Sequence, residues 1–210
     1  GTDTVVAEGD TDFTLSDVRL ERGNGGDAVL AGITRASLVG GAGNNVLDAS
    51  AFTGNTTLTG GDGDDTFAGG SGFDLVAEQA DTDFALSAGA LSGIGADAHS
   101  GIEAFRLTGN ESGNTFTITD YNGSVTLVGG GGDDTFAIER DADFAVIGAG
   151  ITVGGGLQVA LDGIETAALT GGAGANSFSV NTPAVALILD GAAGADTLDF
   201  TADLNQTLSD

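Results

Sequence analysis

The sequence contains no cysteine, no tryptophan, no methionine and a single proline, Pro183. Without cysteine the chain can form neither a disulfide framework nor a thiolate metal site. No apolar run is long enough to cross a membrane, and residues 1–20 lack the basic and then apolar segments of a signal peptide. We therefore predict no membrane insertion, and secretion would require a signal outside these residues.

Positive charge is also scarce. Five arginines and no lysine stand against 31 aspartates and glutamates, which gives a net charge of −26. Binding to phosphate groups requires a basic surface, so this composition excludes nucleic acid as a partner and argues equally against an anionic membrane surface. A compact chain with this charge repels itself, which favours a bound cation in the folded state.

Few side chains are suited to acid-base catalysis near neutral pH. His99 is the only histidine and Tyr121 the only tyrosine, and we expect His99 to lie in a solvated loop. Arg106 and Arg140 are the only arginines in the middle of the chain, and each is expected to balance nearby acids. We predict that the chain is not an enzyme and that it has no catalytic residues.

The chain is built from an internal repeat, and glycine is its commonest turn residue, at 38 positions. An Asp-Thr pair followed by an apolar residue begins at Asp3, Asp65, Asp134 and Asp196, and the second interval is slightly longer than the other two. We expect residues 1–210 to form one domain, composed of repeats 3–64, 65–133 and 134–195 and a partial repeat 196–210.

A shorter period of about 20 residues lies within each repeat, as between Asn45 and Asp65. Short alternating stretches bounded by glycines, such as residues 115–119, indicate strands, and no stretch carries a helical stripe. The pattern predicts an all-β fold, a parallel β-helix or β-roll solenoid with coils of about 20 residues and three coils per 62–69-residue repeat. The extra residues of the second repeat are expected in a surface loop between Phe84 and Ile102.

Stacked coils would bury columns of like apolar side chains, because equivalent strands of neighbouring coils lie about 4.8 Å apart. We predict one column of aromatic residues and leucines and a second column of leucines. The first contains Leu47, Phe67, Phe116, Phe136, Phe178 and Leu198, and the second contains Leu38, Leu58, Leu107, Leu127, Leu169 and Leu189.

Two consecutive nonapeptides, residues 60–68 and 69–77, match the pattern G-G-x-G-x-D-x-U-x, and residues 129–137 match it again. Glycines let the backbone bend sharply and turn its carbonyl oxygens inward, and the aspartate adds a charged oxygen. Calcium takes six to eight oxygen ligands, which two stacked corners can supply together. The pattern resembles the RTX, or haemolysin-type, calcium-binding repeat, and the resemblance implies Ca2+ as the cofactor.

The resemblance implies aspartate ligands at Asp65, Asp74 and Asp134, and at Asp196 in a weaker version of the motif. Only residues 60–77 hold a full turn of two nonapeptides, which favours a wider β-helix with RTX-like corners over an uninterrupted roll. Corners 40–45, 109–114 and 171–176 would then face corners 60–65, 129–134 and 191–196. The candidate metal ligands are Asn45, Asp62, Asp64, Asp65, Asp74, Asn114, Asp133, Asp134, Asn176 and Asp196.

A metal-free interpretation stands beside the calcium one. Gly-Asn and Gly-Asp corners also occur where the side chain hydrogen-bonds its own turn, and a column of asparagines can be a purely structural ladder. If calcium binds, folding should depend on it, because the ligands come together only in the folded chain.

Runs such as Ser-Gly-Ile-Glu-Ala at residues 100–104 resemble the repeat regions of large bacterial surface adhesins and surface-layer proteins. The resemblance implies an extracellular or cell-surface structural module, with a glycan or cell-surface molecule as a possible partner. The alternative is a catalytic or non-catalytic module of a secreted polysaccharide-active β-helix protein. Residues 203–210 repeat residues 10–17, and no capping sequence is visible, so we expect end-to-end self-association or continuation in a longer array.

Overall fold

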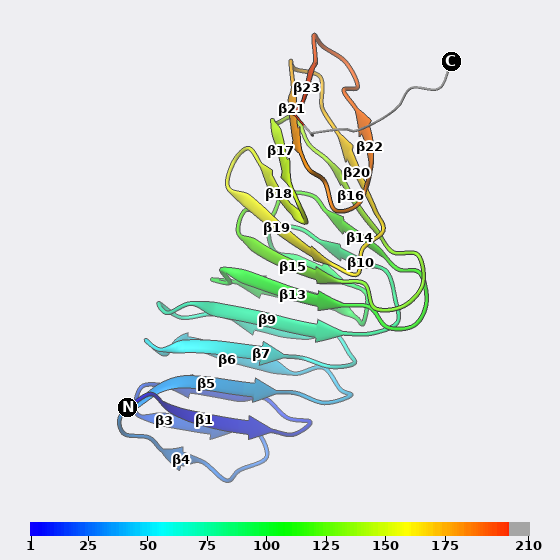
Figure 1. The fold of residues 1–210 in the computed structure, drawn as a ribbon. Helices are drawn as coiled ribbons and strands as arrows, with labels where there is room; N and C mark the ends of the chain where they lie inside the picture. Colours follow the sequence, from blue (N-terminus) through cyan, green and yellow to red (C-terminus); the bar gives the residue numbers. More distant parts are fainter. Residues whose placement is uncertain (202–210) are drawn as a thin grey trace, which may run out of the picture.

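The computed structural model describes residues 1–201, which form 23 β-strands and no helix (Figure 1). The strands belong to two large sheets, one of 11 strands and one of 12, in which most neighbouring strands are parallel. The predicted all-β class is confirmed. No helix capable of crossing a membrane occurs within residues 1–201.

The two sheets have the following strand orders. The 11-stranded sheet runs β1 (Asp3–Glu8), β5 (Ile33–Val39), β7 (Asn55–Thr59), β9 (Asp74–Gln79), β13 (Ala104–Thr108), β15 (Ser124–Val128), β19 (Leu157–Asp162), β18 (Gly150–Val153), β17 (Phe144–Ile147), β21 (Ser177–Asn181), β23 (Thr197–Phe200). The 12-stranded sheet runs β22 (Ala186–Asp190), β20 (Thr166–Thr170), β16 (Thr135–Glu139), β14 (Thr115–Ile118), β10 (Phe84–Leu86), β11 (Ala90–Ser92), β12 (Ala96–Ser100), β8 (Thr66–Ala68), β6 (Val46–Ala51), β2 (Phe13–Ser16), β3 (Arg19–Arg22), β4 (Ala28–Val29).

The chain crosses from one sheet to the other at nearly every corner, as the succession of β5, β6, β7, β8 and β9 shows. Each strand then lies parallel to the strand one winding later, so that Leu38 pairs with Leu58 and Leu47 with Phe67. Alternate side chains of each strand point between the sheets, because successive residues of a strand face opposite sides. The core is therefore a column between the two sheets.

Three excursions interrupt this alternation. In β2–β4, β10–β12 and β17–β19 the chain makes an antiparallel meander within one sheet before it crosses. The last strand of the second meander, β12, returns to lie parallel to β8. Each meander adds rows to one sheet only, and the stack changes direction along its length, visibly near β17–β19 (Figure 1).

The second repeat differs from the first by an additional strand. The stretch from Asp65 to Asp83 is twice as long as its equivalent from Asp3 to Asp12. The additional residues form β9, the second of the two tandem nonapeptides. The expected surface loop within residues 84–102 is therefore wrong, because that segment contains the meander β10–β12.

The second repeat alternates between the sheets as three coils require, whereas the first and third repeats fall short of the prediction by half a winding. The first repeat places β1, β5 and β7 in one sheet and β2–β4 and β6 in the other, which is two and a half windings instead of three. Because the first repeat ends half a winding short, the second repeat begins in the other sheet. The strand at Asp3 belongs to the 11-stranded sheet, whereas the strand that follows Asp65 belongs to the 12-stranded sheet. The residues after Asp196, three repeats later than Asp3, return to the 11-stranded sheet.

This change of sheet divides the predicted core columns. Phe116 pairs with Phe136 in the 12-stranded sheet, whereas Phe178 pairs with Leu198 in the 11-stranded sheet. The members are buried as predicted except at the last coils, where Leu198 is 59% exposed and Leu189 is partly buried. The prediction is therefore confirmed for neighbouring members of each column, such as Phe116 and Phe136, and wrong where it joins all members into one continuous column.

His99 lies in the core and not in a solvated loop. It is only 8% exposed and takes a place in β12 beside Phe67. Its ring makes edge contacts with Phe105, at 4.8 Å between centroids, and with Tyr121, at 6.0 Å. Burial lowers the pKa of His99, so the imidazole is held in its neutral form.

Candidate metal-binding corners

The three predicted pairs of corners are in contact through the same hydrogen bond. In each pair the backbone N–H of the asparagine donates to the Oδ1 of the aspartate 20 residues later. The N···O distances are 2.7 Å for Asn45 and Asp65, 2.7 Å for Asn114 and Asp134, and 2.9 Å for Asn176 and Asp196. The third pair connects the sheets in the opposite sense to the first two, because it follows strands of the 12-stranded sheet.

The asparagine side chains are fully engaged with protein groups. Asn45 Oδ1 accepts the N–H of Gly41 at 2.7 Å, and its Nδ2 donates to Asp10 Oδ1 at 3.2 Å. Asn176 makes the same two contacts, with Gly172 N and Asp141 Oδ1. An aspartate could accept the first bond but could not donate the second. These contacts explain why the first corner of each pair ends in asparagine.

A second set of acids, which the sequence analysis missed, supports the asparagine corners. Asp10 and its equivalents accept the amide hydrogens of the asparagines, and the aspartates two residues later accept the first N–H of the next strand, as Asp12 does from Val46 at 2.8 Å. The signal was present as Asp-x-Asp-Phe, which recurs at residues 10–13, 81–84 and 141–144.

The aspartates of the second corners differ from the asparagines in one respect. Asp65 Oδ2 and Asp134 Oδ2 are buried and have no hydrogen-bond partner in the part of the chain that the structure describes. Each oxygen lies against the first glycine of its own corner, Gly60 or Gly129. A buried carboxylate oxygen without a partner is unfavourable by about 1–3 kcal/mol or more. Binding of a cation or a proton at these two atoms would therefore stabilise the folded chain.

Further acids surround Asp65. Its own N–H donates to Asp97 Oδ1 at 2.9 Å, and the N–H of Gly60 donates to Glu78 Oε1 at 2.5 Å. Asp97 and Glu78 are 4% and 3% exposed, so both carboxyls are inside the molecule. Asp134 is supported in the same way by Glu165, whose Oε2 accepts its N–H at 2.7 Å.

This packing changes the protonation of the corner at residues 60–65. Burial, assisted by the negative charges of Asp97, Asp64 and Asp10, raises the pKa of Asp65 to about 6. Burial likewise raises the pKa of Glu78 to about 7, with contributions from Asp97 and Asp65. Without a cation, the folded chain therefore favours protons on carboxyls that would otherwise be ionised at neutral pH.

The other candidate ligands have different surroundings. Asp74 is buried, and both of its carboxylate oxygens are occupied, Oδ2 by the N–H of Gly70 and Oδ1 by the N–H and hydroxyl of Thr56. The remaining three acids, Asp62, Asp64 and Asp133, are exposed at the tips of the corners. Within residues 1–201 no group of three or more His, Cys, Asp or Glu side chains is arranged to hold a metal ion.

The groups considered for catalysis are engaged elsewhere. His99 Nε2 lies 3.0 Å from the carbonyl oxygen of Ser87, and the Tyr121 hydroxyl donates to the carbonyl of Ile102 at 3.0 Å. Burial raises the pKa of Tyr121 well above its usual value. Arg140 donates to Asn122 Oδ1 at 2.9 Å, and within residues 1–201 it forms no ion pair with an acid.

The corners thus present hard oxygen ligands, carboxylates and backbone carbonyls, and no sulfur or imidazole. Such a set suits calcium or magnesium and not a transition metal. Comparison of the chain with protein-family models, with curated proteins and with solved structures gives no match.

Proposed function

We propose that this chain is a calcium-stabilised structural repeat module of an extracellular surface protein, adhesin or filament, wound as a β-solenoid. The single observation that carries the proposal is the pair of buried carboxylate oxygens, Asp65 Oδ2 and Asp134 Oδ2, that lack a partner at corners matching the calcium-repeat pattern. The parallel pairing of each strand with the strand one winding later, across two facing sheets, supports the solenoid winding.

Calcium fits these two corners by chemistry. Asp65 and Asp134 would supply charged oxygens, and carbonyls of the stacked corners 40–45 and 109–114 would supply neutral ones. The ion would neutralise part of the net charge of −26 and satisfy the buried oxygens. Asn45, Asn114 and Asn176 would keep their structural hydrogen bonds, because both atoms of an engaged amide are already used.

A non-catalytic role agrees with the position of the acid-base candidates. His99 and Tyr121 lie in the core with their polar atoms bonded to backbone carbonyls.

Calcium is expected to raise the stability of the chain, and the gain should depend on the two corners. With calcium in about 100-fold excess over its dissociation constant, each filled site should add about 2–3 kcal/mol to the free energy of unfolding. Far-UV circular dichroism during thermal unfolding, with calcium and with a chelator, measures this effect. Asp65→Asn and Asp134→Asn should each remove about half of the gain.

The matched control is Asp120→Asn, which makes the same change of charge at an exposed residue between β14 and β15, away from the candidate corners. This variant should keep the full calcium response. Identical unfolding curves with calcium and with chelator, or an equal loss of response in all three variants, would contradict calcium binding at these corners.

We also propose that the module associates with further copies of itself through its outermost strands. Within residues 1–201, β1 and β4 lie at one end of the two sheets and β22 and β23 at the other. Apolar side chains are exposed there, with Val29 at 89%, Ile188 at 60% and Leu198 at 59%. Unpaired strand edges with apolar side chains favour strand addition.

Sedimentation velocity tests this association. The chain should form species larger than a monomer as its concentration rises, and Val29→Lys and Leu198→Lys should shift the equilibrium toward monomers. A strictly monomeric chain at high concentration would refute end-to-end association.

A further inference from the structure

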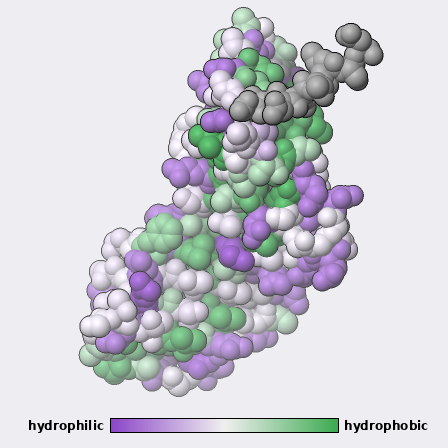
Figure 2. Space-filling model, in the orientation of Figure 1, coloured by the Kyte–Doolittle hydropathy of each residue, from purple (hydrophilic) through white to green (hydrophobic). Residues whose placement is uncertain are grey.

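The outer face of the 11-stranded sheet carries unusually little negative charge for this chain. On the neighbouring strands β5, β7, β9, β13 and β15 the acids are buried or lie at corners, and the outward residues are serine, threonine, asparagine, glutamine, small apolar residues and two arginines. Figure 2 shows this face with hydrophobic and weakly polar residues across its lower half and strongly hydrophilic ones mainly toward its margins. Exposed acids flank these five strands at Glu8 of β1 and Asp162 of β19.

A depression of about 420 Å³ opens on this face between β5, β7 and β9. Three of its lining residues form a row across the strands. Arg35 pairs with Asn55, and Asn55 Oδ1 accepts the N–H of Phe73 at 3.0 Å. The Phe73 side chain is 49% exposed, although most phenylalanines of the chain are buried. The row therefore places a guanidinium, an amide and an open aromatic ring side by side.

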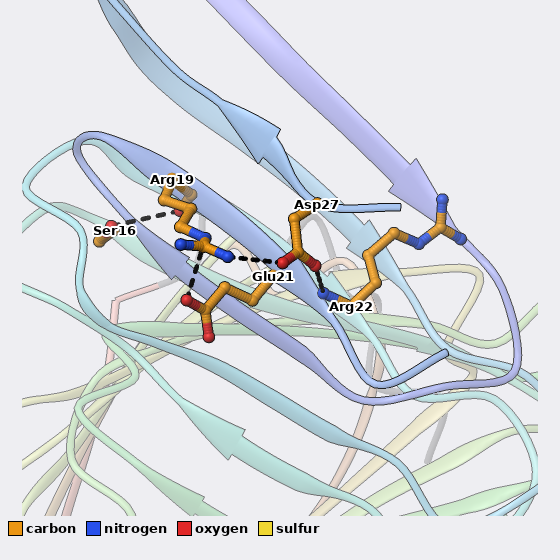
Figure 3. Close-up of polar contacts among 5 residues, drawn as sticks. All are labelled: Ser16, Arg19, Glu21, Arg22 and Asp27. Atoms are coloured by element: carbon orange, nitrogen blue, oxygen red, sulfur yellow. Dashed lines mark hydrogen bonds and ion pairs between the residues drawn. The ribbon is translucent and has the colours of Figure 1, made fainter. Parts of the chain in front are cut away.

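Within the described residues the Arg35 side chain makes neither an ion pair nor a hydrogen bond, whereas Arg19 and Arg22 are both engaged. Arg19 is held by Glu21 at 3.0 Å and by Asp27 at 2.6 Å (Figure 3). Arg22 donates to the carbonyl of Glu8 and lies over the ring of Phe13. Within residues 1–201 the ion pairs are those of Arg19, so Arg35 is uncommitted in a chain with 31 acids.

A second depression of about 310 Å³ lies farther along the same strands and contains Arg106, also without an ion pair in the described residues. It shares β7 and β9 with the first depression, and Arg106 pairs with Ala77 of β9. Three strand spacings across the sheet and about four residues along β9 separate the two arginines. These offsets place the Cα atoms of the two arginines about 20 Å apart.

We propose that this face binds an extended acidic polysaccharide, with Arg35 and Arg106 as its anchors. A planar guanidinium binds a carboxylate or sulfate through two parallel hydrogen bonds, and Phe73 offers a ring against which a sugar can pack. The hydroxyl and amide side chains between them suit sugar hydroxyls. A ligand with two acidic groups about 20 Å apart must be a polymer, which excludes a small anion as the full occupant.

The same charges argue against nucleic acid, because one phosphate per nucleotide would meet the acidic corners on both sides of the face. A polysaccharide with one acidic group on every second sugar presents fewer charges over the same length, so it meets less repulsion from those corners. The proposal adds a binding role to the structural one and does not depend on calcium at the corners.

Isothermal titration with hyaluronan and unsulfated chondroitin octasaccharides tests the proposal, with cellohexaose as the neutral sugar and polyglutamate as the acidic peptide. Arg35→Gln should weaken binding of the acidic octasaccharides by about 10-fold, and Phe73→Ala by about 5-fold. Arg106→Gln should weaken octasaccharide binding and leave disaccharide binding unchanged, because a disaccharide cannot reach both arginines.

Arg19→Gln is the matched control, since it makes the same change of charge at an exposed arginine away from this face. It should change the affinity by less than about 2-fold. All titrations are run at saturating calcium with the fold checked by circular dichroism, so loss of the fold is distinguished from loss of the ligand. Absence of binding to either acidic sugar, equal binding of cellohexaose or polyglutamate, or an equal loss in Arg19→Gln would overturn the proposal.

Discussion

Replacement of Gly129 by alanine is expected to destabilise the fold by about 3 kcal/mol or more, whereas the same replacement at Gly131 should cost less than about 1 kcal/mol. A Cβ at Gly129 would meet the carbonyl oxygen of Gly163 and the buried carboxylate of Asp134. A Cβ at Gly131 would have its nearest neighbours, atoms of Glu111, at 3.6 Å. Neither glycine has a positive φ, so the difference between the variants is steric.

Urea unfolding monitored by circular dichroism measures both variants under one set of conditions. The clash at Gly129 involves backbone of the neighbouring winding, which can move only if the stacking of corners 129–134 and 163–165 changes. Equal stabilities of the Gly129→Ala and Gly131→Ala variants would contradict this stacking of the two corners.

The stacking of corners could be predicted from the sequence because it depends on local spacing. The 20 residues from Asn45 to Asp65 are two strands and two corners, and that spacing holds wherever the chain winds without interruption. The meanders could not be distinguished from such a winding. The stretch from Phe13 to Ile33 has the same length, yet these residues make one crossing, because three antiparallel strands return the chain to the far edge of the same sheet.

The candidate site was predicted in part for the same reason. Asp65 and Asp134 belong to a local motif, and one carboxylate oxygen of each is buried without a partner in the described residues. Their role as metal ligands stays a prediction. Asp97 lies in β12, the last strand of a meander, and Glu78 lies in the additional strand β9. Their approach to the corner therefore depends on how the strands of one sheet are aligned with those of the other. No spacing in the sequence predicts that alignment.

His99 illustrates how the wrong prediction for this segment affected individual residues. Once residues 96–100 are a strand beside β8, alternation places His99 on the same side as Phe67, which faces the core. Interpretation of the segment as a loop removed that constraint. The residue was therefore predicted in solvent.

In metal-free solution, the free energy of unfolding is expected to fall as the pH rises from about 5 to about 8, with Glu78 as the main cause. Burial raises the pKa of Glu78 from 4.5 to about 7, so between these values the folded chain holds a proton that the unfolded chain releases. Stability that is present below pH 4.5 is then lost as the pH rises through 7, by up to about 3 kcal/mol. Asp65, with its pKa raised to about 6, acts in the same direction.

Glu78→Gln should flatten this dependence, because the amide can still accept the Gly60 N–H but does not titrate. The slope should not vanish, since Asp65 still titrates and His99, whose pKa is lowered, contributes stability of the opposite sign as the pH rises toward 6.5. Urea midpoints across the pH range measure the effect. Glu139→Gln, at an exposed position ending β16, is the matched control and should keep the wild-type slope.

The same titration with calcium separates protonation from metal binding. Calcium binds ionised carboxylates, so its stabilising effect should increase with pH while the metal-free stability decreases. The separation between the two curves should therefore increase from about pH 5 to pH 8, and this increase should be lost in Asp65→Asn. A calcium effect that is independent of pH would show that the buried carboxyls of this corner are not the ligands, even if calcium binds elsewhere on the chain.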